Sequence, residues 1–595
     1  MRNQRTILTV LTLLVSLAAT GCLQAGSAAE PARRLELAPC TEPGFPPDAR
    51  CGTYQVFENR AARSGRKIPL RVVVLPATGP QRLPDPFVYF AGGPGGASIP
   101  EGIEMARLLP SLRQKRDVLL VDFRGIGQSG GLFCPELGGA EGVQGALDDF
   151  LPTDKIRACR DRLKKEVDLS WYTTDAAIED IEEVRAALGY GPLNLMGVSY
   201  GTRAVLTYLR LHPGSVRTAT LEGVLAPDGR YPLGLARAGQ EALEGLIAEC
   251  EGDPACRGAF PQLRQEVDAV LRRAAAEPVR VELPGPGGPV ETRLGLQGVA
   301  QTLRYRLYTP AEAALLPLEV HLAAQGDWTP LARAARGYGS FMVSATATGF
   351  YQSVTCAEDL AFLRDDEIGA AVAGTFLGDF RVRAQKAACE GWPIRTLGPD
   401  LHAPIVSDVP ALLISGERDP ATPAAGAERV SRTLKRSRRL VIADGGHGTD
   451  GMQGNDCPMG LIAAFIEAGT AEGLDTSCIA RMRRPEFMLS SASADGPEVP
   501  VAQADLERLQ GSYTNRDMGL TIKVDLLEGR LHLAFTEGPP FPPALLIPAS
   551  PTRFRVEGEG LAPGLAAVFH VTEGKATALS VFQPGMPEVV LERTE

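Results

Sequence analysis

The chain has 595 residues, which is too long for one ordinary hydrophobic core, so two or three domains are expected. Apolar residues make up 44% and charged residues 22%, a composition that excludes a disordered or fibrous chain. The net charge of −10 is spread along the sequence without long runs of one sign, which argues against a nucleic-acid partner.

The first 29 residues have the pattern of an export signal. Arg2 and Arg5 precede an apolar run over residues 7–19 that is too short to span a bilayer. Small residues at 27–29 suit cleavage by signal peptidase. Alternatively, residues 17–22 look like a lipoprotein box, in which Cys22 becomes the lipidated first residue and attaches the protein to a membrane. We therefore expect an exported protein, either a membrane-anchored lipoprotein or a periplasmic or secreted form.

The cysteine count agrees with export. There are 11 cysteines, and setting Cys22 aside leaves an even set of ten, as expected for disulfides in an exported chain. Pairing each cysteine with its neighbour gives the loops 40–51, 134–159, 250–256, 356–389 and 457–478. The sequence does not fix this connectivity, and buried free thiols are the alternative, because cysteine is also a small apolar residue.

Short apolar runs recur along residues 35–229 and again along 401–487. Those expected to form strands are 54–57, 70–75, 87–90, 118–121, 193–196, 218–221, 411–415 and 440–443. Amphipathic segments at 174–188 and 202–211 are expected to form helices between them. Solid apolar runs that alternate with helices predict an α/β fold with a mainly parallel sheet, buried on both faces.

Two further regions differ from this pattern. Residues 230–400 favour helices, notably at 236–248, 263–276 and 310–323, so we expect a mostly helical cap inserted into the sheet domain. Residues 490–496 have the composition of a linker. Residues 500–595 then alternate in short segments, which predicts a small antiparallel β-domain, either a sheet or a barrel.

The clearest motif is Gly-Val-Ser-Tyr-Gly at 197–201. It directly follows one expected strand and opens a helix, which is the context of a nucleophile elbow. Glycines are needed on both sides of Ser199 because side chains there would collide with the neighbouring strand and helix. The turn exposes the hydroxyl at the N-terminus of a helix, so Ser199 is the predicted nucleophile.

A serine nucleophile needs a base, and the base needs an acid that orients it. Of the six histidines, only His447 lies in a loop just after an expected strand, so it is the predicted base. Asp419 precedes it by 28 residues and completes the chain order Ser, Asp, His. Glu417 is the rival acid, and Asp419 is preferred because it lies deeper in the loop.

The remaining catalytic requirement is a pair of backbone donors for the oxyanion. The amide of Tyr200, directly after the nucleophile, is one candidate. Gly93, in the glycine-rich turn at 92–96, is the other, because glycine lets the backbone approach a substrate closely. No metal site is expected, since the sequence has neither paired histidines nor zinc-type Cys-x-x-Cys spacing. No cofactor is expected either.

Several motifs resemble the proline-iminopeptidase and tripeptidyl-aminopeptidase family of α/β hydrolases. They are 92–96 (Gly-Gly-Pro-Gly-Gly), 122–129 (Asp-Phe-Arg-Gly-Ile-Gly-Gln-Ser), 197–202, 416–423, 446–448 and, in the cap, 354–359 and 389–393. Ala91 departs from many proline iminopeptidases, which carry His there, and this favours the tripeptidyl branch. Residues 500–595 are similar to a β-domain appended to exported serine hydrolases and relatives of penicillin-binding proteins.

The resemblance implies a peptide substrate with a free N-terminus. A carboxylate must then hold the substrate ammonium at a fixed distance from the nucleophile. Glu222, at the end of the strand after the elbow helix, and Glu358 and Asp359 in the cap are the candidates. We expect an exported serine aminopeptidase. An esterase or lactonase with the same triad, or a binding protein with a decayed site, are the alternatives. The oligomeric state is not predicted.

Overall fold

The computed structural model describes residues 35–594 except 43–44, 139–143, 148–149, 286–287, 491–497, 516–519, 538–542, 559–564, 573 and 583–588. The expected leader, with Cys22, lies outside the described residues. So does all but the first residue of the expected linker. Among the described residues, none of the helices combines the length and the apolar character needed to cross a bilayer.

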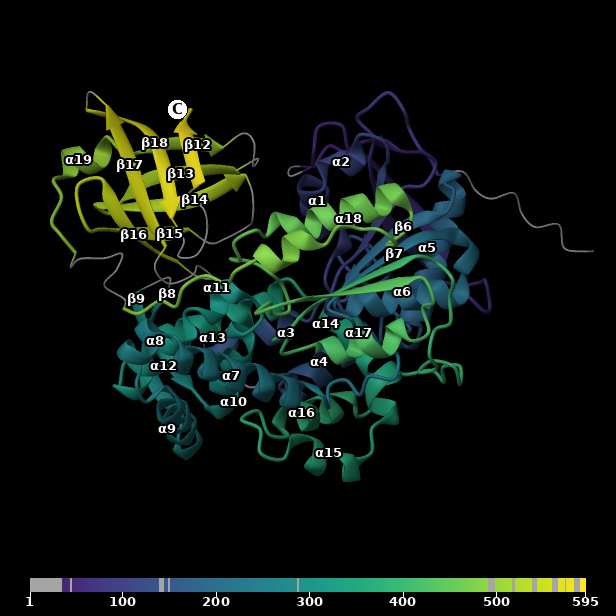
Figure 1. Ribbon diagram of the computed structural model, residues 1–595, viewed down its shortest axis with the longest axis horizontal. Coiled ribbons are helices and arrows are strands. Elements are labelled where there is room, and N and C mark those ends of the chain that lie inside the picture. Colours follow the sequence, from purple (N-terminus) through teal and green to yellow (C-terminus); the bar gives the residue numbers. More distant parts are fainter. Residues whose placement is uncertain are drawn as a thin grey trace, which may run out of the picture.

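A nine-stranded sheet forms the core of the α/β domain, in the right part of Figure 1. In spatial order its strands are β1 (Ala38–Pro39), β2 (Arg50–Phe57), β3 (Lys67–Leu75), β5 (Val118–Val121), β4 (Phe87–Phe90), β6 (Leu193–Val198), β7 (Val216–Glu222), β10 (Ala411–Gly416) and β11 (Ser437–Ile442). The strands from β5 to β11 run parallel, and β1, β2 and β3 pair antiparallel at one side. The α/β prediction is confirmed, including its solid apolar strands, because both faces of this sheet are covered.

Helices cover the two faces of the sheet. On one face, α1 (Ser98–Leu108) and α18 (Asp456–Ala468) contribute apolar side chains to a shared core. On the other, α5 (Thr174–Leu188), α6 (Tyr200–Leu211) and α17 (Ala424–Ser431) pack into a second core. Both ends of α5 agree with the expected helix at 174–188, because its apolar residues repeat on one face.

The expected cap is mostly helical and lies between β7 and β10 (below the sheet in Figure 1). Its helices are α7 (Leu235–Gly252), α8 (Pro254–Ala259), α9 (Leu263–Ala276), α10 (Leu296–Arg306), α11 (Pro310–Ala313), α12 (Leu316–Ala324), α13 (Thr329–Ser344), α14 (Thr348–Val354), α15 (Asp365–Val372) and α16 (Phe380–Cys389). The cap also contains a β-hairpin that was not predicted, β8 (Val279–Gly285) with β9 (Gly288–Leu294). Leu283 and Leu294 are buried in the cap core and hold this hairpin in place.

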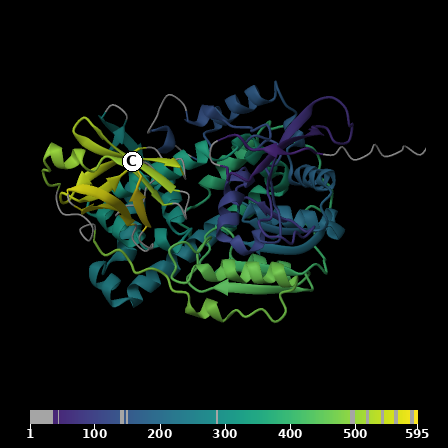
Figure 2. The same ribbon diagram turned by 90° about the horizontal axis from the view of Figure 1, so that it is seen from above.

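The C-terminal region folds as a closed antiparallel barrel beside the rest of the chain (Figures 1 and 2). Its strands are β12 (Gly511–Asn515), β13 (Leu520–Leu527), β14 (Arg530–Glu537), β15 (Ala544–Pro548), β16 (Arg553–Glu557), β17 (Ala566–Thr572), β18 (Lys575–Phe582) and β19 (Val589–Arg593). The expected antiparallel β-domain is therefore a barrel, and closure leaves it without a free sheet edge.

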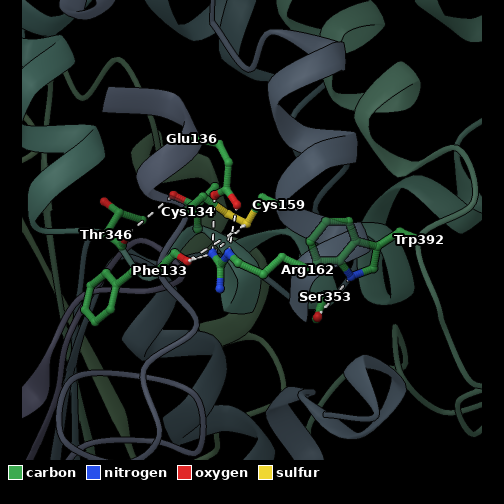
Figure 3. Close-up of a disulfide and its surroundings, with 9 residues drawn as sticks. Phe133, Cys134, Glu136, Cys159, Arg162, Thr346, Ser353 and Trp392 are labelled. Atoms are coloured by element: carbon green, nitrogen blue, oxygen red, sulfur yellow. Dashed lines mark hydrogen bonds and ion pairs between the residues drawn. A yellow bond between two sulfur atoms is a disulfide. The ribbon is translucent and has the colours of Figure 1, made fainter. Parts of the chain in front are cut away.

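The ten cysteines are joined in the five neighbouring pairs, with Cα–Cα separations from 5.0 to 5.8 Å. One disulfide, Cys134–Cys159, ties the loop after β5 to α4 (Thr153–Leu163) (Figure 3). Glu136 lies beside its sulfurs and forms an ion pair with Arg162. This group has the residue types of a metal site, but both sulfurs are consumed by the disulfide, so they are not available as thiolate ligands.

Candidate active site

Ser199 stands at the turn between β6 and α6. Its φ is 56°, a left-handed value that a non-glycine residue adopts only where the surroundings impose it. The two flanking glycines are required, as expected. A Cβ on Gly197 would collide with the carbonyl oxygen of Gly201, and one on Gly201 would collide with that of Phe90. The Ser199 amide donates a 2.8 Å hydrogen bond to the carbonyl oxygen of Glu222, which anchors the turn to β7.

His447 lies in the loop after β11 and contacts Asp419 from the loop after β10. Its Nδ1 is 3.0 and 2.9 Å from the two carboxylate oxygens of Asp419. The buried Asp419 also accepts hydrogen bonds from the amides of Ala421 and Thr422, both at 2.8 Å. The rival acid, Glu417, is exposed and instead accepts a 3.3 Å hydrogen bond from the amide of Asp444. The geometry therefore favours Asp419 as the partner of His447.

Electrostatics keep Asp419 ionised. Burial alone would raise its pKa, but His447 and the hydrogen bonds from Thr422 outweigh burial and hold the pKa below its usual range. An ionised carboxylate at Nδ1 keeps the proton on that nitrogen and leaves Nε2 of His447 as the basic atom.

Contacts through β7 and Thr422 bring Ser199 and His447 to the same end of the sheet. Gly223 follows the residue that accepts from the Ser199 amide, and a Cβ on Gly223 would lie 3.1 Å from Cε1 of the imidazole. The Thr422 hydroxyl lies 3.1 Å from Nδ1 of His447. Thr422 also lines a cavity with Ser199. The predicted nucleophile and base are thus assembled from strand ends that are far apart in sequence.

The cavity beside Ser199, of about 40 Å³, contains both predicted oxyanion donors. It is lined by Gly93, Pro94, Ser199, Tyr200, Arg203, Leu225, Tyr231, Leu235, Tyr308, Asp359, Ala421 and Thr422. In the described part of the chain, neither the Gly93 amide nor the Tyr200 amide donates a hydrogen bond to another protein group. A Cβ on Gly92 would lie 3.2 Å from the Cβ of Ser199, so this turn approaches the nucleophile closely. Both amides are available to an oxyanion formed at Ser199.

Two of the three predicted amine-binding carboxylates are neighbours at this cavity. Glu358 and Asp359 are buried in a single π-helical turn, Thr355–Asp359. Asp359 lines the cavity and forms hydrogen bonds of 2.6 and 3.1 Å with Arg203. Glu358 lies one layer behind, where it accepts from the amide and hydroxyl of Thr174 at 2.6 and 2.7 Å. The disulfide Cys356–Cys389 fixes this turn to α16.

Glu222, the third candidate, occupies a different place. It ends β7, and it is not among the described residues that line the cavity beside Ser199. Burial raises the pKa of Glu222 to about 7, with repulsion from Asp450 adding to the shift and His447 opposing it. Glu222 therefore interacts electrostatically with His447, and its role in binding the substrate ammonium stays a prediction.

The Glu222 carboxyl makes stability depend on pH. Its pKa is raised in the folded protein, so the folded state holds a proton that the unfolded state releases. The resulting stabilisation is present below pH 4.5 and is lost as the pH rises towards 7. Glu222→Gln is expected to reduce the fall in unfolding free energy between pH 4.5 and 8 by about 3 kcal/mol. Urea unfolding at several pH values measures this, and an equal fall in both proteins would contradict it.

Arg203, Thr422, Tyr231 and Tyr308 were not predicted as site residues. The sequence did contain a signal for Arg203. This residue lies four positions after Ser199, one helical turn further along the same face of α6. The two tyrosines come from the cap, and only the tertiary fold brings them to the cavity. The edge of the Tyr308 ring lies against His447, with centroids 5.0 Å apart.

Comparisons with known proteins agree with this architecture. Residues 85–248 match the family model of the alpha/beta hydrolase fold, and residues 375–478 match that of the TAP-like protein family. The serine protease Hip1 of Mycobacterium tuberculosis is 25% identical over 511 residues, which cover 78% of this chain and 96% of Hip1. The tripeptidyl aminopeptidase of Streptomyces lividans is 26% identical over 470 residues, which cover 73% and 84%.

A solved structure, that of the proline iminopeptidase of Mycobacterium smegmatis, has a TM-score of 0.31 and 14% identity, covering 70% of this chain and 98% of that one. The sequence relatives carry peptidase names, and the family models match both halves of the sheet domain. The chain is therefore a hydrolase with the α/β-hydrolase fold, and its sequence is similar to those of tripeptidyl aminopeptidases and proline iminopeptidases.

Proposed function

We propose that this chain is an exported serine aminopeptidase that removes short peptides or single residues from a free N-terminus through an acyl-enzyme. The observation that carries the proposal is the position of Asp359. Its carboxylate lines the same cavity as Ser199, so one cavity offers both a nucleophile and an anionic group. A substrate whose ammonium reached Asp359 would present a carbonyl a fixed distance away to Ser199.

The charges around Asp359 favour a cation. Arg203 lies between two carboxylates, 2.6 Å from Asp359 and 3.5 Å from Glu358. Burial raises the pKa of Glu358 to about 7 although Arg203 opposes the shift, so near neutral pH this carboxyl readily exchanges its proton. With both carboxylates ionised the group carries one uncompensated negative charge. An ammonium ion bound there would compensate it and stabilise the ionised form of Glu358.

The proposed reaction uses Ser199, His447 and Asp419 as a catalytic triad. His447 Nε2 removes the proton from Ser199, whose oxygen attacks the carbonyl carbon of the scissile bond. The amides of Gly93 and Tyr200 stabilise the oxyanion, and Asp419 stabilises the imidazolium. The imidazolium then protonates the leaving amine, so the C–N bond breaks and the acyl-enzyme remains. Water, activated by the same histidine, releases the N-terminal fragment and restores Ser199.

Matched substrates test the proposal. A tripeptidyl p-nitroanilide with a free N-terminus is expected to be cleaved with a kcat/KM about 100-fold or more above that of its N-acetylated form, because acetylation removes the charge that Asp359 binds. Asp359→Asn is expected to reduce this ratio. Thermal unfolding of the variant checks that the loss does not come from misfolding around Arg203.

Two outcomes of the same experiment would contradict the proposal. Equal cleavage of the free and acetylated amides would remove the role of the N-terminus. Cleavage of short acyl esters without any cleavage of the peptidyl amides would favour the esterase or lactonase alternative instead.

Export is part of the proposal and has two supports. The sequence begins with two arginines and an apolar run, and the ten remaining cysteines lie in five disulfide pairs, which persist in oxidising compartments. Attachment to a membrane through a lipid on Cys22 remains a proposal on the same basis. Mass spectrometry of the mature N-terminus separates cleavage before Cys22 from cleavage near residue 29.

A further inference from the structure

A second cavity lies next to the site, between the cap and the segment of the sheet domain that contains Leu147 and Phe150. It has a volume of about 80 Å³ and a mostly apolar wall that includes Phe150, Tyr338 and Tyr351. It adjoins the glycine-rich turn beside Ser199, because the amide of Ala347, next to its lining residue Thr346, donates a 3.0 Å hydrogen bond to the carbonyl oxygen of Gly95. The two cavities therefore lie on neighbouring segments of the chain.

Arg381, on α16, lies beside both cavities. Its guanidinium carbon is 4.2 Å from the centre of the Phe150 ring, on the wall of the second cavity. Its Nη2 donates a 3.2 Å hydrogen bond to the hydroxyl of Tyr231, on the wall of the cavity beside Ser199. One buried cation thus contacts the walls of both cavities.

Arg381 has no anionic partner among the residues that the structure describes. The side chain is only 6% exposed, and its Nε and Nη1 are buried without a hydrogen-bond acceptor. The groups that act on it most strongly are the phenols of Tyr231, Tyr351, Tyr338 and Tyr308, and none of these four is a carboxylate. Burying a guanidinium without an anionic partner destabilises the folded state, so the burial of Arg381 calls for an explanation.

Arg304, on α10, adds a second cation to the same cluster. It is 1% exposed and donates to the Tyr308 hydroxyl at 2.8 Å and to Gln301 at 3.3 Å, both uncharged groups. Burial would raise the pKa of Tyr338, but Arg381 and Arg304 outweigh burial and lower it. The two arginines therefore create a positive field at a phenol that lines the second cavity.

A neighbouring arginine, Arg306, is paired with carboxylates, as buried charged residues usually are. Arg306 follows Arg304 by two residues and is also buried, and it forms ion pairs with Glu312 and Glu319. The cap thus provides two carboxylates for this buried arginine. Among the described residues, neither Arg304 nor Arg381 forms an ion pair with a carboxylate, and both contact side chains that line the two cavities.

We infer that the cluster of Arg304, Arg381 and Tyr338 binds a carboxylate of the substrate. The inference rests on the proposed function, because the ligand is a peptide held between Asp359 and this cluster. The carboxylate belongs either to an acidic side chain or to the C-terminus of a short peptide. Both present the same planar anion to the donors of Arg381 and to the Tyr338 hydroxyl.

Binding to the full-length Ser199→Ala protein tests the inference without turnover. The probes are tetra-alanine amides with Glu at one position at a time, each with a Gln counterpart, and tetra-alanine as free acid and as amide. Isothermal titration calorimetry is expected to show at least tenfold tighter binding for one member of these pairs, Glu over Gln or acid over amide. Which pair responds identifies the source of the carboxylate.

Variants then assign the preference to the cluster. Adding Arg381→Gln is expected to bring the preferred pair to within about twofold of each other. Arg381→Lys, which keeps the charge and loses the planar group, is expected to retain part of the preference and serves if Arg381→Gln does not fold. Arg383→Gln is the matched control, because it removes the same charge from an exposed position on α16 that is paired with Asp379.

The outcomes separate the two proposals. Peptides that bind equally well in every pair, or a preference that survives both Arg381 variants, would overturn the carboxylate site while leaving the aminopeptidase proposal intact. Failure of all the peptides to bind would overturn the aminopeptidase proposal and this inference with it.

Discussion

Ser199→Ala is expected to lower kcat for the best peptidyl amide by about a million-fold, because the covalent route needs the Ser199 oxygen. The loss should appear in kcat rather than in KM, since the cavity walls and Asp359 are unchanged by the substitution. Steady-state kinetics against a free N-terminal p-nitroanilide measures both constants.

The control for this substitution is Ser344→Ala, which removes an exposed hydroxyl at the end of α13 in the cap. It is expected to leave kcat within a factor of two. Full turnover by the Ser199→Ala protein on every substrate that the wild type cleaves would mean that another residue is the nucleophile.

Asp419→Asn is expected to lower kcat by about 10⁴-fold while the fold persists. The amide keeps the shape of the carboxylate but loses its charge, so it neither fixes the proton on Nδ1 of His447 nor stabilises the imidazolium. Its NH₂ group can also donate to Nδ1, which selects the tautomer with its proton on Nε2, where the base is needed. The pH dependence of kcat/KM should change with it.

Glu417→Gln is the matched control, because this carboxylate lies two residues away on the same loop and contacts the amide of Asp444 instead of His447. It is expected to retain most of the activity. A larger loss for Glu417→Gln than for Asp419→Asn would exchange the roles of the two acids.

Much of the sheet domain was predictable because its signals are local. β4 and β5 are short runs of large apolar residues, buried on both faces, and the expected ranges agree with the observed ones. The hairpin of β8 and β9 was missed although Val-Arg-Val-Glu-Leu at 279–283 alternates as a strand does, since helical segments on both sides dominate that region. In the barrel, β15 carries Leu-Leu-Ile beside prolines and lacks the alternation on which the prediction of a β-domain over residues 500–595 rests.

The residues of the candidate site likewise fall into two groups: those that local sequence patterns predict, and those that only the tertiary structure brings together. Ser199 and His447 follow from motifs next to strands, and chain order points to Asp419. The ion pair of Arg203 with Asp359 joins residues 156 positions apart, and no local sequence pattern predicts it. That Arg381 has no carboxylate partner among the described residues depends on its neighbours in the folded chain, which include Tyr338 on α13 and Tyr351 on α14.

Labelling by a fluorophosphonate probe, followed by peptide mass spectrometry, tests the central claim most directly, because the probe reacts with a serine activated by its histidine and captures the nucleophile itself. We predict one label per chain, carried by the peptide that contains Ser199, and no label on the Ser199→Ala protein. A label on a different residue, or an unlabelled protein that still cleaves peptidyl amides, would contradict the assignment of Ser199 and His447.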